Sequence, residues 1–455
     1  MNAPTRGYTL DFIKSMITEQ SGFARGWFND LELRTVFQPT FGLPHKEVIG
    51  FEANLRGYDP NGKPVSPEIL FGPVENYAET AMLDLLSATM HVHNFFTGNA
   101  SKGLLLINLH PEVFVDYSAG AEFLAELFRH YGASADRIMI DIPGSALENE
   151  RLDDAIGAYR ELGCLIAVDD FGVDNTNLDS VWHTAPAVVK IGRSMIARTV
   201  AEQRVRQILP RAVSLLHEMG TLVLMEGIES ETEALIAIDT DADFGSGYFF
   251  GPLQETVRDY QPPRELLNGV WGNYKKKYVP VRQAETSARL SLEDEALYSS
   301  QIKNLRNASP VEISRYREQR HPFINALKNI ALAVKTTDEF AARCQEILKI
   351  PSTIRCFMLD AEGRQIGADV VSPNAPTARG VDFNGLAGRP AGEWSRRDFF
   401  RRAIKEPQVV QVTRQYCSLT GYPHCVTFSI ATRMEEKLFV ICCDVDWTSH
   451  DKVHH

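Results

Sequence analysis

Short apolar runs alternate with longer amphipathic stretches from about residue 31 to residue 250. The apolar runs are RTVFQPTF, EVIGFEANLR, GLLLINL, RIMIDI, CLIAVDD, AVVKIG, TLVLMEG and FGSGYFF. This alternation is typical of an α/β fold with a mostly parallel sheet. About eight such units in roughly 250 residues fit a TIM-like (β/α)8 barrel. One amphipathic stretch, residues 194–219, contains Pro210, which we expect to break or bend the helix there.

Most of these runs end in a polar side chain. The strand-end residues are Asn108, Asp141, Asp169, Asp170, Lys190 and Glu226. Glu52 lies inside its run, where alternation places it on one face with Asn54 and Arg56. The C-terminal ends of barrel strands meet at one mouth, so we expect these side chains to lie together there. A single carboxylate at a strand end is usually a cap, but this concentration of them predicts an active site.

So much negative charge at one rim predicts bound cations, because neighbouring carboxylates repel one another unless a cation neutralises them. Oxygen ligands with no thiolate and no clustered histidine suit Mg²⁺ or Mn²⁺. The adjacent Asp169 and Asp170 would then help to hold two ions about 3.5–4 Å apart.

Composition excludes several classes of protein. The 455 residues are too many for one core and predict two or three domains. A net charge of -12 argues against binding a nucleic acid polymer, which needs clustered Lys and Arg. No window reaches the ~20 apolar residues of a membrane helix, and the N-terminus has no secretory pattern, so we expect a cytoplasmic protein.

The seven cysteines are odd in number and favour reduced thiols, with Cys442 and Cys443 buried on opposite faces of a strand.

The region from about residue 31 to residue 253 resembles the EAL family, which comprises bacterial phosphodiesterases and receptors of cyclic di-GMP. Asn108 matches the family's strand-end asparagine, and six motifs agree in order and spacing. These are FQP at 37–39, EANLR at 52–56, DDFG at 169–172, VKI at 189–191, EGIE at 226–229, and GY with GPL at 247–253.

The resemblance implies a chemistry. Family members hydrolyse one phosphodiester of cyclic di-GMP to the linear dinucleotide pGpG, using two divalent metal ions and a water. The metal ligands would be Glu52, Asn108, Asp141, Asp169, Asp170 and Glu226. The catalytic residues would be Glu52, Asp170, Lys190 and Glu226, and the substrate-binding residues would be Gln38, Arg56 and Asp169. Lys190 would orient the water or stabilise charge on phosphorus, and Arg56 would grip a phosphate through its planar fork.

The chain departs from the family pattern around these ligands. Asp141 and Gly144 each stand where the family has glutamate, Gly192 replaces an aspartate, and Ser246 replaces a glutamine. Residues 173–177 read VDNTN instead of the family's Thr-Gly-Tyr-Ser-Ser, and Asn54 replaces a leucine. Weak support of metal ligands lowers metal affinity or activity, so we expect weak or gated turnover.

The C-terminal third differs in composition. We expect the EAL domain to span residues 1–275, a charged helical linker 276–320, and a sensor domain 321–455. Phe323, Leu327, Ile330 and Val334 form an apolar stripe that is either core or the face of a homodimer. A hairpin is predicted around Glu362–Gly363.

The segments 394–400, 416–421 and 443–445 resemble a Cache/PAS-like domain. By this resemblance, Trp394, Arg397, Tyr416 and Asp444 would line a small-ligand pocket, with Arg397 meeting a ligand carboxylate and Asp444 an amine. The alternative is that these residues pack and hydrogen-bond with no ligand.

Two functions therefore stand against each other. One is a metal-dependent cyclic di-GMP phosphodiesterase, and the other is a catalytically silent cyclic di-GMP receptor. A third class, a Schiff-base enzyme using Lys190, fits poorly because it would not need so many carboxylates around the lysine. The sequence contains no Gly-Gly-Asp-Glu-Phe motif, so we do not expect synthesis of the messenger.

Overall fold

The computed structural model of the chain consists of two compact units. One comprises Met1–Ala237 with Ala242–Leu267, and the other comprises Ile238–Asp241 with Asn268–His455. The structure describes residues 8–66, 69–70, 77–97, 103–109, 117–148, 150–172, 178–258, 260–277, 310–378, 392–435 and 437–448.

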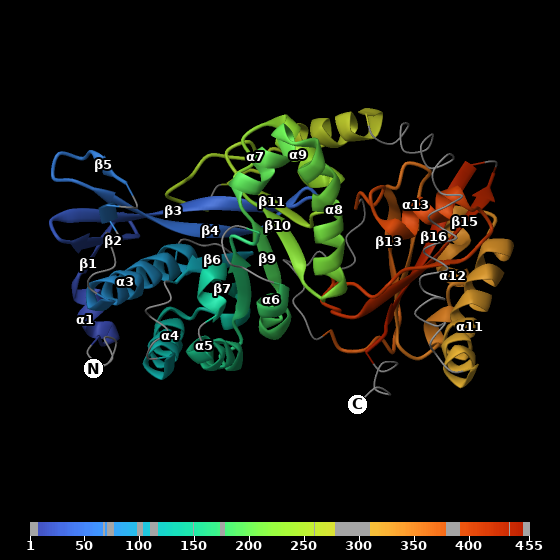
Figure 1. The fold of residues 1–455 in the computed structure, drawn as a ribbon, viewed down its shortest axis with the longest axis horizontal. Helices are drawn as coiled ribbons and strands as arrows, with labels where there is room; N and C mark the ends of the chain where they lie inside the picture. Colours follow the sequence, from blue (N-terminus) through green and yellow to red (C-terminus); the bar gives the residue numbers. More distant parts are fainter. Residues whose placement is uncertain are drawn as a thin grey trace. The chain divides into compact units, whose positions relative to one another are not determined.

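A closed barrel of eight strands forms the first unit (Figure 1). Its strands are β3 (Leu31–Gly42), β4 (Glu47–Tyr58), β6 (Leu104–Asn108), β7 (Ile138–Pro143), β8 (Leu165–Asp169), β9 (Val188–Ile191), β10 (Leu222–Met225) and β11 (Phe244–Ser246). Each strand pairs with the next, and the pairing of β3 with both β4 and β11 closes the ring. The predicted TIM-like barrel is therefore confirmed.

One strand of the barrel runs against the others. β3 is antiparallel to β4 and to β11, whereas the remaining neighbours are parallel. Only residues 43–46 join β3 to β4, and such a short connection makes a hairpin because a parallel crossover needs about a dozen residues or more. The same antiparallel sheet continues beyond the barrel through β1 (Ile17–Gln20) and β2 (Phe23–Phe28), and β5 (Pro64–Val65) pairs with β4.

Helices surround the barrel strands. They are α1 (Leu10–Ser15), α3 (Tyr77–Phe96), α4 (Tyr117–Tyr131), α5 (Glu150–Glu161), α6 (Leu178–Thr184), α7 (Arg193–Ala201), α8 (Gln203–Glu218) and α9 (Glu231–Asp239), with 3₁₀ turns η3 (Ala135–Arg137) and η4 (Gly144–Glu148). A continuous core joins α3, α4 and α5 to the strands, with Leu86, Leu127 and Ile156 buried in it. This packing fixes the strand ends that carry the polar residues.

The helix does not break at Pro210, and a bend there, the other predicted possibility, stays a prediction. The helical stretch divides at Glu202, whose backbone is extended (φ −118°, ψ 112°), and α8 then continues through Pro210. Proline removes one backbone hydrogen bond from a helix. Here the buried face of α8, which includes Leu209, Val213 and Leu216, holds the helix against the barrel on both sides of the proline.

The second unit is built on a five-stranded antiparallel sheet in the order β13-β12-β16-β15-β14. Its strands are β12 (Thr353–Leu359), β13 (Gln365–Val371), β14 (Gln411–Val412), β15 (Cys425–Met434) and β16 (Lys437–Asp446). Its helices are α11 (Pro310–Ala333), α12 (Phe340–Arg343) and α13 (Asp398–Lys405), with η5 (Thr337–Glu339) and η6 (Ile347–Lys349). The predicted hairpin is confirmed: Leu359 pairs with Gln365 across a turn that contains Gly363 at φ +79°. The Cache/PAS-like assignment stays a prediction.

The apolar stripe of the C-terminal third lies in the core of this sheet unit. Phe323, Leu327, Ile330 and Val334 are all buried, and the Phe323 ring stacks on Phe428 of β15 with 5.1 Å between centroids. Of the two alternatives left by the sequence, the stripe is therefore core. A homodimer stays a prediction, but this buried stripe does not supply its interface. α11 also runs through the predicted linker boundary at residue 320, and the three predicted domain ranges stay predictions.

The cysteines are free thiols, as predicted, and Cys442 and Cys443 are fully buried. Among the helices that the structure describes, none combines the length and the hydropathy needed to cross a lipid bilayer.

Candidate functional site

Lys190 lies at the centre of the barrel mouth, where its side chain is completely buried. Its Nζ is 2.7 Å from Glu226 Oε1, 3.2 Å from Glu52 Oε1 and 3.5 Å from Asp169 Oδ2, and it donates a hydrogen bond to Asp141 Oδ2. These four carboxylates come from four different strands or strand ends, so the cluster depends on closure of the barrel. The expected gathering of strand-end charge is present.

The register of the strands explains the cluster. Asn108 lies opposite Asp141 in the β6–β7 pair, and Lys190 lies opposite Leu224 in the β9–β10 pair, two residues before Glu226. Asn108 Nδ2 donates to Glu52 Oε1 at 3.2 Å and holds that carboxylate at the mouth. Five of the six predicted metal ligands are therefore linked, through Lys190 or through Glu52.

Burial and charge shift the acidities of this cluster. Burial raises the pKa of Asp141 to about 8, helped by the nearby Asp169 and Glu52 and opposed by Lys190. Burial also raises the pKa of Glu226 well above its ordinary value, against the opposing effect of Lys190. Burial would raise the pKa of Glu52 too, but Lys190 and Asn108 outweigh it and that pKa is lowered. Burial lowers the pKa of Lys190, and the surrounding carboxylates reverse this and raise it well above normal.

Asp170, the sixth predicted ligand, is placed differently. Its backbone is left-handed (φ +52°), and its N–H donates to Asp169 Oδ1 at 2.7 Å. Its exposed side chain lies over Gly192, because a Cβ at residue 192 would be 2.7 Å from Asp170 Oδ1. Among the described residues, the carboxylates within 4.0 Å of Lys190 Nζ do not include that of Asp170.

The donor set fits a hard divalent cation by its chemistry. Asp141 Oδ1 is buried and accepts no hydrogen bond from the part of the chain that the structure describes, so it keeps a free lone pair inside the cluster. Carboxylate and amide oxygens without thiolates are ligands for Mg²⁺, Mn²⁺ or Ca²⁺. As the side chains stand, no three Asp, Glu, His or Cys of the described ranges converge on one ion position. The Lys190 ammonium occupies the point that the carboxylates share.

The predicted substrate-binding residues flank this cluster. Gln38 lies opposite Glu52 in the β3–β4 pair, but it is only 8% exposed and its Nε2 donates to Gly251 O at 2.8 Å. Its amide therefore anchors the closing segment of the barrel. Arg56 is half-buried on the same face of β4 as Glu52, and its NH1 donates to the carbonyl of Leu55 at 2.9 Å. Among the residues that the structure describes, this is the one hydrogen bond shown for Arg56, which leaves its other guanidinium donors for a ligand.

The departures from the family pattern surround the ligands. Gly144 is the first residue of η4, directly after β7, and supplies no side chain there. Ser246 ends β11 and is buried. Residues 173–177 lie outside the described residues. The space above Gly192 was not predictable from the sequence, since it depends on the fold bringing residues 170 and 192 together.

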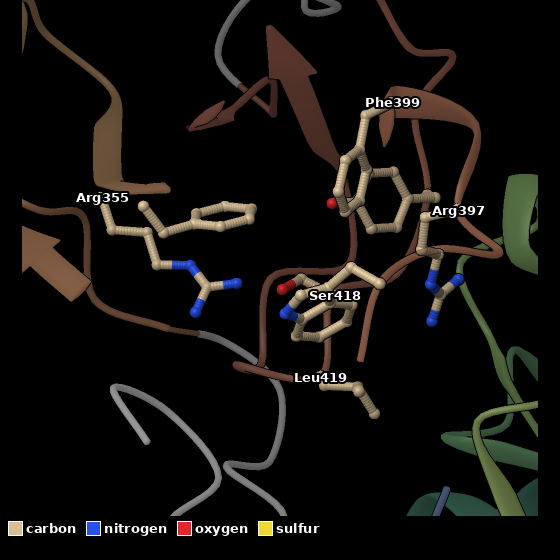
Figure 2. A pocket seen from close by; sticks show the side chains of 8 residues that line it. Arg355, Arg397, Phe399, Ser418 and Leu419 are labelled. Carbon is tan, nitrogen blue, oxygen red and sulfur yellow. The ribbon is translucent and has the colours of Figure 1, made fainter. Parts of the chain in front are cut away.

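The four residues predicted for a sensor pocket occupy one region of the C-terminal unit. Trp394, Arg397 and Tyr416 line a cavity of about 10 Å³, and Asp444 does not (Figure 2). Its other lining residues are Arg355, Phe357, Phe399, Ser418 and Leu419. Figure 2 shows Arg355 and Arg397 on opposite sides of the cavity, with the Arg397 guanidinium turned away from it. Arg355 was missed, although a charge inside the apolar run TIRCFML was a signal for it.

Asp444 is part of a buried polar network behind this cavity. Arg355 donates to Asp444 Oδ2 at 2.8 Å and to Asp369 Oδ2 at 2.6 Å. Thr427 Oγ1 donates to Asp444 Oδ1 at 2.7 Å and also bonds the Tyr416 hydroxyl at 2.7 Å. A volume of about 10 Å³ is near the minimum for one water molecule. Binding of a small ligand by these residues stays a prediction.

Comparison with known proteins identifies the family to which the barrel belongs. The family model of the EAL domain matches residues 25–252, which is half of the chain. The chain belongs to the EAL domain family. The predicted resemblance is thereby confirmed for the barrel unit.

Two curated relatives give the range of similarity. The chain is 23% identical over 235 residues to the cyclic di-GMP phosphodiesterase RocR of Pseudomonas aeruginosa, covering 49% of this chain and 58% of that protein. It is 25% identical over 236 residues to the cyclic di-GMP phosphodiesterase PdeF of Escherichia coli, covering 50% of this chain and 31% of that protein. The EAL domain thus accounts for these matches, which span 58% of RocR and 31% of PdeF.

One solved structure is similar over most of the chain. This is YkuI of Bacillus subtilis, a protein with an EAL domain in complex with cyclic di-GMP and calcium. It has 18% sequence identity and a TM-score of 0.48, and the match covers 91% of this chain and 96% of that one. A manganese and cyclic di-GMP complex of BlrP1 from Klebsiella pneumoniae matches 49% of this chain at 20% identity, with a TM-score of 0.45, and covers 56% of its own chain.

Proposed function

We propose that this protein is a cyclic di-GMP-specific phosphodiesterase that uses two Mg²⁺ or Mn²⁺ ions to hydrolyse cyclic di-GMP to linear pGpG. Its turnover is weak or gated by the C-terminal unit. The observation that carries the proposal is the convergence of Glu52, Asp141, Asp169 and Glu226 on Lys190 at the mouth of an EAL domain barrel. The relatives named as cyclic di-GMP phosphodiesterases support it.

The residues that would hold the ions are Glu52, Asn108, Asp141, Asp169, Asp170 and Glu226. When bound, divalent ions lower the pKa of a water and stabilise negative charge on phosphoryl oxygens. Lys190 would turn its three N–H donors from the carboxylates towards that water or the phosphate, where charge develops. Arg56 would bind two oxygens of a phosphate group through its planar guanidinium.

Two features support weak turnover. Asp141 is one methylene shorter than the family's glutamate, and one of its oxygens is hydrogen-bonded to Lys190. Metal–ligand distances tolerate only about 0.2 Å, so the ion or the backbone must shift to reach this carboxylate. Gly144 offers no side chain to hold the segment after Asp169–Asp170.

The same features favour the second candidate, a receptor that binds cyclic di-GMP without cleaving it. A receptor needs Arg56 and the mouth of the barrel but not a precisely placed water. The two candidates differ in one observable, the linear product.

For the C-terminal unit we propose a small ligand with a carboxylate, held near Trp394, Arg397 and Tyr416. Support comes from the position of all three on one cavity. The cavity must enlarge to take such a ligand, because about 10 Å³ holds at most a water.

The test combines two measurements on the full chain. Calorimetry with cyclic di-GMP and Ca²⁺ or Mg²⁺ measures binding, and chromatography after incubation with Mg²⁺ or Mn²⁺ measures linear product. We expect binding that Arg56→Ala weakens, together with slow product formation. Binding without product would select the receptor, and no heat at high micromolar protein would reject both.

A further inference from the structure

β3 and β4 continue beyond the mouth of the barrel as part of an antiparallel sheet. The parallel pairing of β4 with β6 ends at Ala53 and Ile107, and the residues of β4 from 54 to 58 pair with β3 alone or with β3 and β5. β2 pairs with the other edge of β3 in this region (Figure 1). Residues 23–28, 31–36 and 54–58 therefore form a three-stranded surface next to the carboxylate cluster, which we call the extended sheet.

The two faces of the extended sheet have different surroundings. One face packs on α3: Leu33 is fully buried in the core there, and a Cβ on Gly26 would lie 2.7 Å from Met90 Sδ. Glu52, which contacts Lys190 inside the mouth, belongs to the opposite face, because side chains alternate along a strand. This second face is open to solvent, and it leads directly away from the proposed metal ligands.

Arginines and aromatic rings lie in two neighbouring rows on the open face. In the first row, Arg34 of β3 is directly opposite Arg56 of β4. In the second row, Glu32 of β3 lies between Trp27 and Tyr58, since it pairs with both. The side chain of Trp27 is 49% exposed. Guanidinium groups beside an open ring suit a nucleotide, because its phosphate meets positive charge and its base stacks on the ring.

Arg34 is held in place and still has hydrogen-bond donors to offer. Its Nε and Nη2 donate to the two carboxylate oxygens of Glu32 at 3.0 and 3.1 Å, and its Nη1 donates to Glu255 Oε1 at 3.4 Å. The guanidinium also lies over the Tyr58 ring, 4.4 Å from the centroid. An arginine has five N–H groups, so the contacts with described residues leave one N–H on each terminal nitrogen. Two such N–H groups can donate to O6 and N7 of guanine, a pairing that adenine does not offer.

We infer that the open face of the extended sheet binds the second guanine of cyclic di-GMP, with Arg34 donating to the guanine edge and Trp27 stacking on the base. This inference rests on the proposed function, which supplies the substrate and places one phosphate on Arg56. Because that phosphate is joined directly to a nucleoside, the base lies within one nucleotide of Arg56, and Arg34 is the residue opposite. Trp27 is diagonal to Arg34 across β2 and β3, a separation that a long side chain and a ring can span.

A purely structural role for Arg34 makes a different prediction, and Arg25 of β2 is the matched comparison. Arg25 donates to the same carboxylate, Glu32 Oε1, at 2.6 Å, and the side chains of both arginines are 26% exposed. If the ion pairs with Glu32 only stabilise the sheet, the two arginines are equivalent. A contact with guanine belongs to Arg34 alone, since Arg25 lies one strand further from Arg56.

The experiment is calorimetry of the full chain with Ca²⁺ and two ligands. One is cyclic di-GMP, and the other is cyclic GMP–AMP, in which adenine replaces one guanine and the linkages are unchanged. Cyclic GMP–AMP can still place its guanine nearest the carboxylate cluster, so the ratio of the two dissociation constants reports the second base. The variants are Arg34→Ala, Arg34→Lys, Arg25→Ala, Trp27→Ala and Trp27→Phe, and thermal unfolding shows that each is folded.

We expect wild type to bind cyclic di-GMP about 5- to 150-fold more tightly than cyclic GMP–AMP, the discrimination of one bidentate arginine–guanine pair. Both Arg34 variants should bring this ratio close to one, because lysine keeps the charge and loses the planar fork. Arg25→Ala should leave the ratio unchanged. Trp27→Ala should weaken both ligands by a similar factor of about 5 to 150, since every base can stack, and Trp27→Phe should restore most of the binding.

Four results would overturn the inference: equal affinity of wild type for the two ligands, an unchanged ratio in both Arg34 variants, an equal fall of the ratio in Arg25→Ala, or wild-type binding by Trp27→Ala. Formation of pGpG is measured separately on the same proteins with Mn²⁺. The expected binding pattern without product would reject the phosphodiesterase and leave the inference standing. Product formation with any of the four results would do the reverse, and binding of neither ligand by wild type would reject both.

Discussion

The single ammonium of Lys190 is what allows four carboxylates to gather at the barrel mouth. Each of them lies within 3.5 Å of its Nζ, and the lysine is completely buried. Removal of one partner from a buried ion cluster leaves the others uncompensated. Lys190 therefore takes, in this structure, the electrostatic place that we propose for divalent ions.

This leads to a prediction about stability. Lys190→Ala should lower the free energy of unfolding in EDTA by up to about 3–5 kcal/mol, because the four carboxylates lose the cation that they share. Mn²⁺ should then stabilise this variant more than it stabilises wild type, since the ion binds the folded state alone. Thermal unfolding with and without Mn²⁺ measures both effects. Lys63→Ala, on an exposed lysine of the same unit, is the control, and a variant as stable as wild type in EDTA would contradict the argument.

Residue-level features differ in how far the sequence predicts them. The cluster of Glu52, Asp141, Asp169, Lys190 and Glu226 was predictable, because parallel strands bring their C-terminal ends to one mouth. The partner of Asp170 was not, since a glycine leaves no mark of the space it opens. For Arg355 the charge inside an apolar run was a signal, but its aspartate partners, 14 and 89 residues away in the sequence, could not be named from it.

At the scale of elements, the end of β7 is one of the places where this barrel departs from the family pattern. Asp141 accepts a hydrogen bond from Lys190. Three residues later, η4 begins at Gly144, which has no side chain. A misplacement near ~1 Å can cost on the order of 100-fold in rate. The ligands are thus present while the element that holds them is altered.

Repair of this element should raise activity. Asp141→Glu combined with Gly144→Glu should increase hydrolysis of cyclic di-GMP modestly and steepen its dependence on Mg²⁺, because a longer carboxylate reaches the ion and a second one holds the neighbouring segment. Rates measured across a Mg²⁺ series test this. Gly157→Glu adds the same charge to α5 in open space and should change neither rate nor Mg²⁺ dependence. A repaired variant that binds two ions yet hydrolyses no faster would move the limitation elsewhere.

The periodicity of the sequence predicted which segments are helices and which are strands. It did not predict the direction of β3 or the residue at which the helix divides. The run RTVFQPTF reads the same whether its strand is parallel or antiparallel, so the reversed β3 was not visible. The helix break came at Glu202 and not at Pro210, because apolar packing along α8 outweighs the one hydrogen bond that proline removes.

On the scale of the whole molecule, the chain has a barrel unit and a sheet unit, each with its own core. α11 supplies the apolar stripe of the second core, with Leu327 completely buried and Leu332 of the same helix 67% exposed. These two leucines make a matched pair for a test of gating.

Leu327→Ala should destabilise the C-terminal unit by about 2–5 kcal/mol through loss of apolar contact and the cavity left behind. Leu332→Ala should change stability little. If this unit gates turnover, only Leu327→Ala should alter the rate of product formation at a temperature where the barrel stays folded. Equal rates in the two variants, with the expected difference in unfolding temperature, would contradict gating.

The central claim is that the carboxylates around Lys190 hold the ions that drive cleavage of cyclic di-GMP. The most direct measurement is the rate of pGpG formation with Mn²⁺ by wild type, by Glu52→Ala and by Asp169→Asn, each with an EDTA blank. Both variants remove a proposed ligand. We predict slow product formation by wild type that EDTA stops, and none by either variant. Product formation that continues in EDTA, or at an unchanged rate in either variant, would contradict the account.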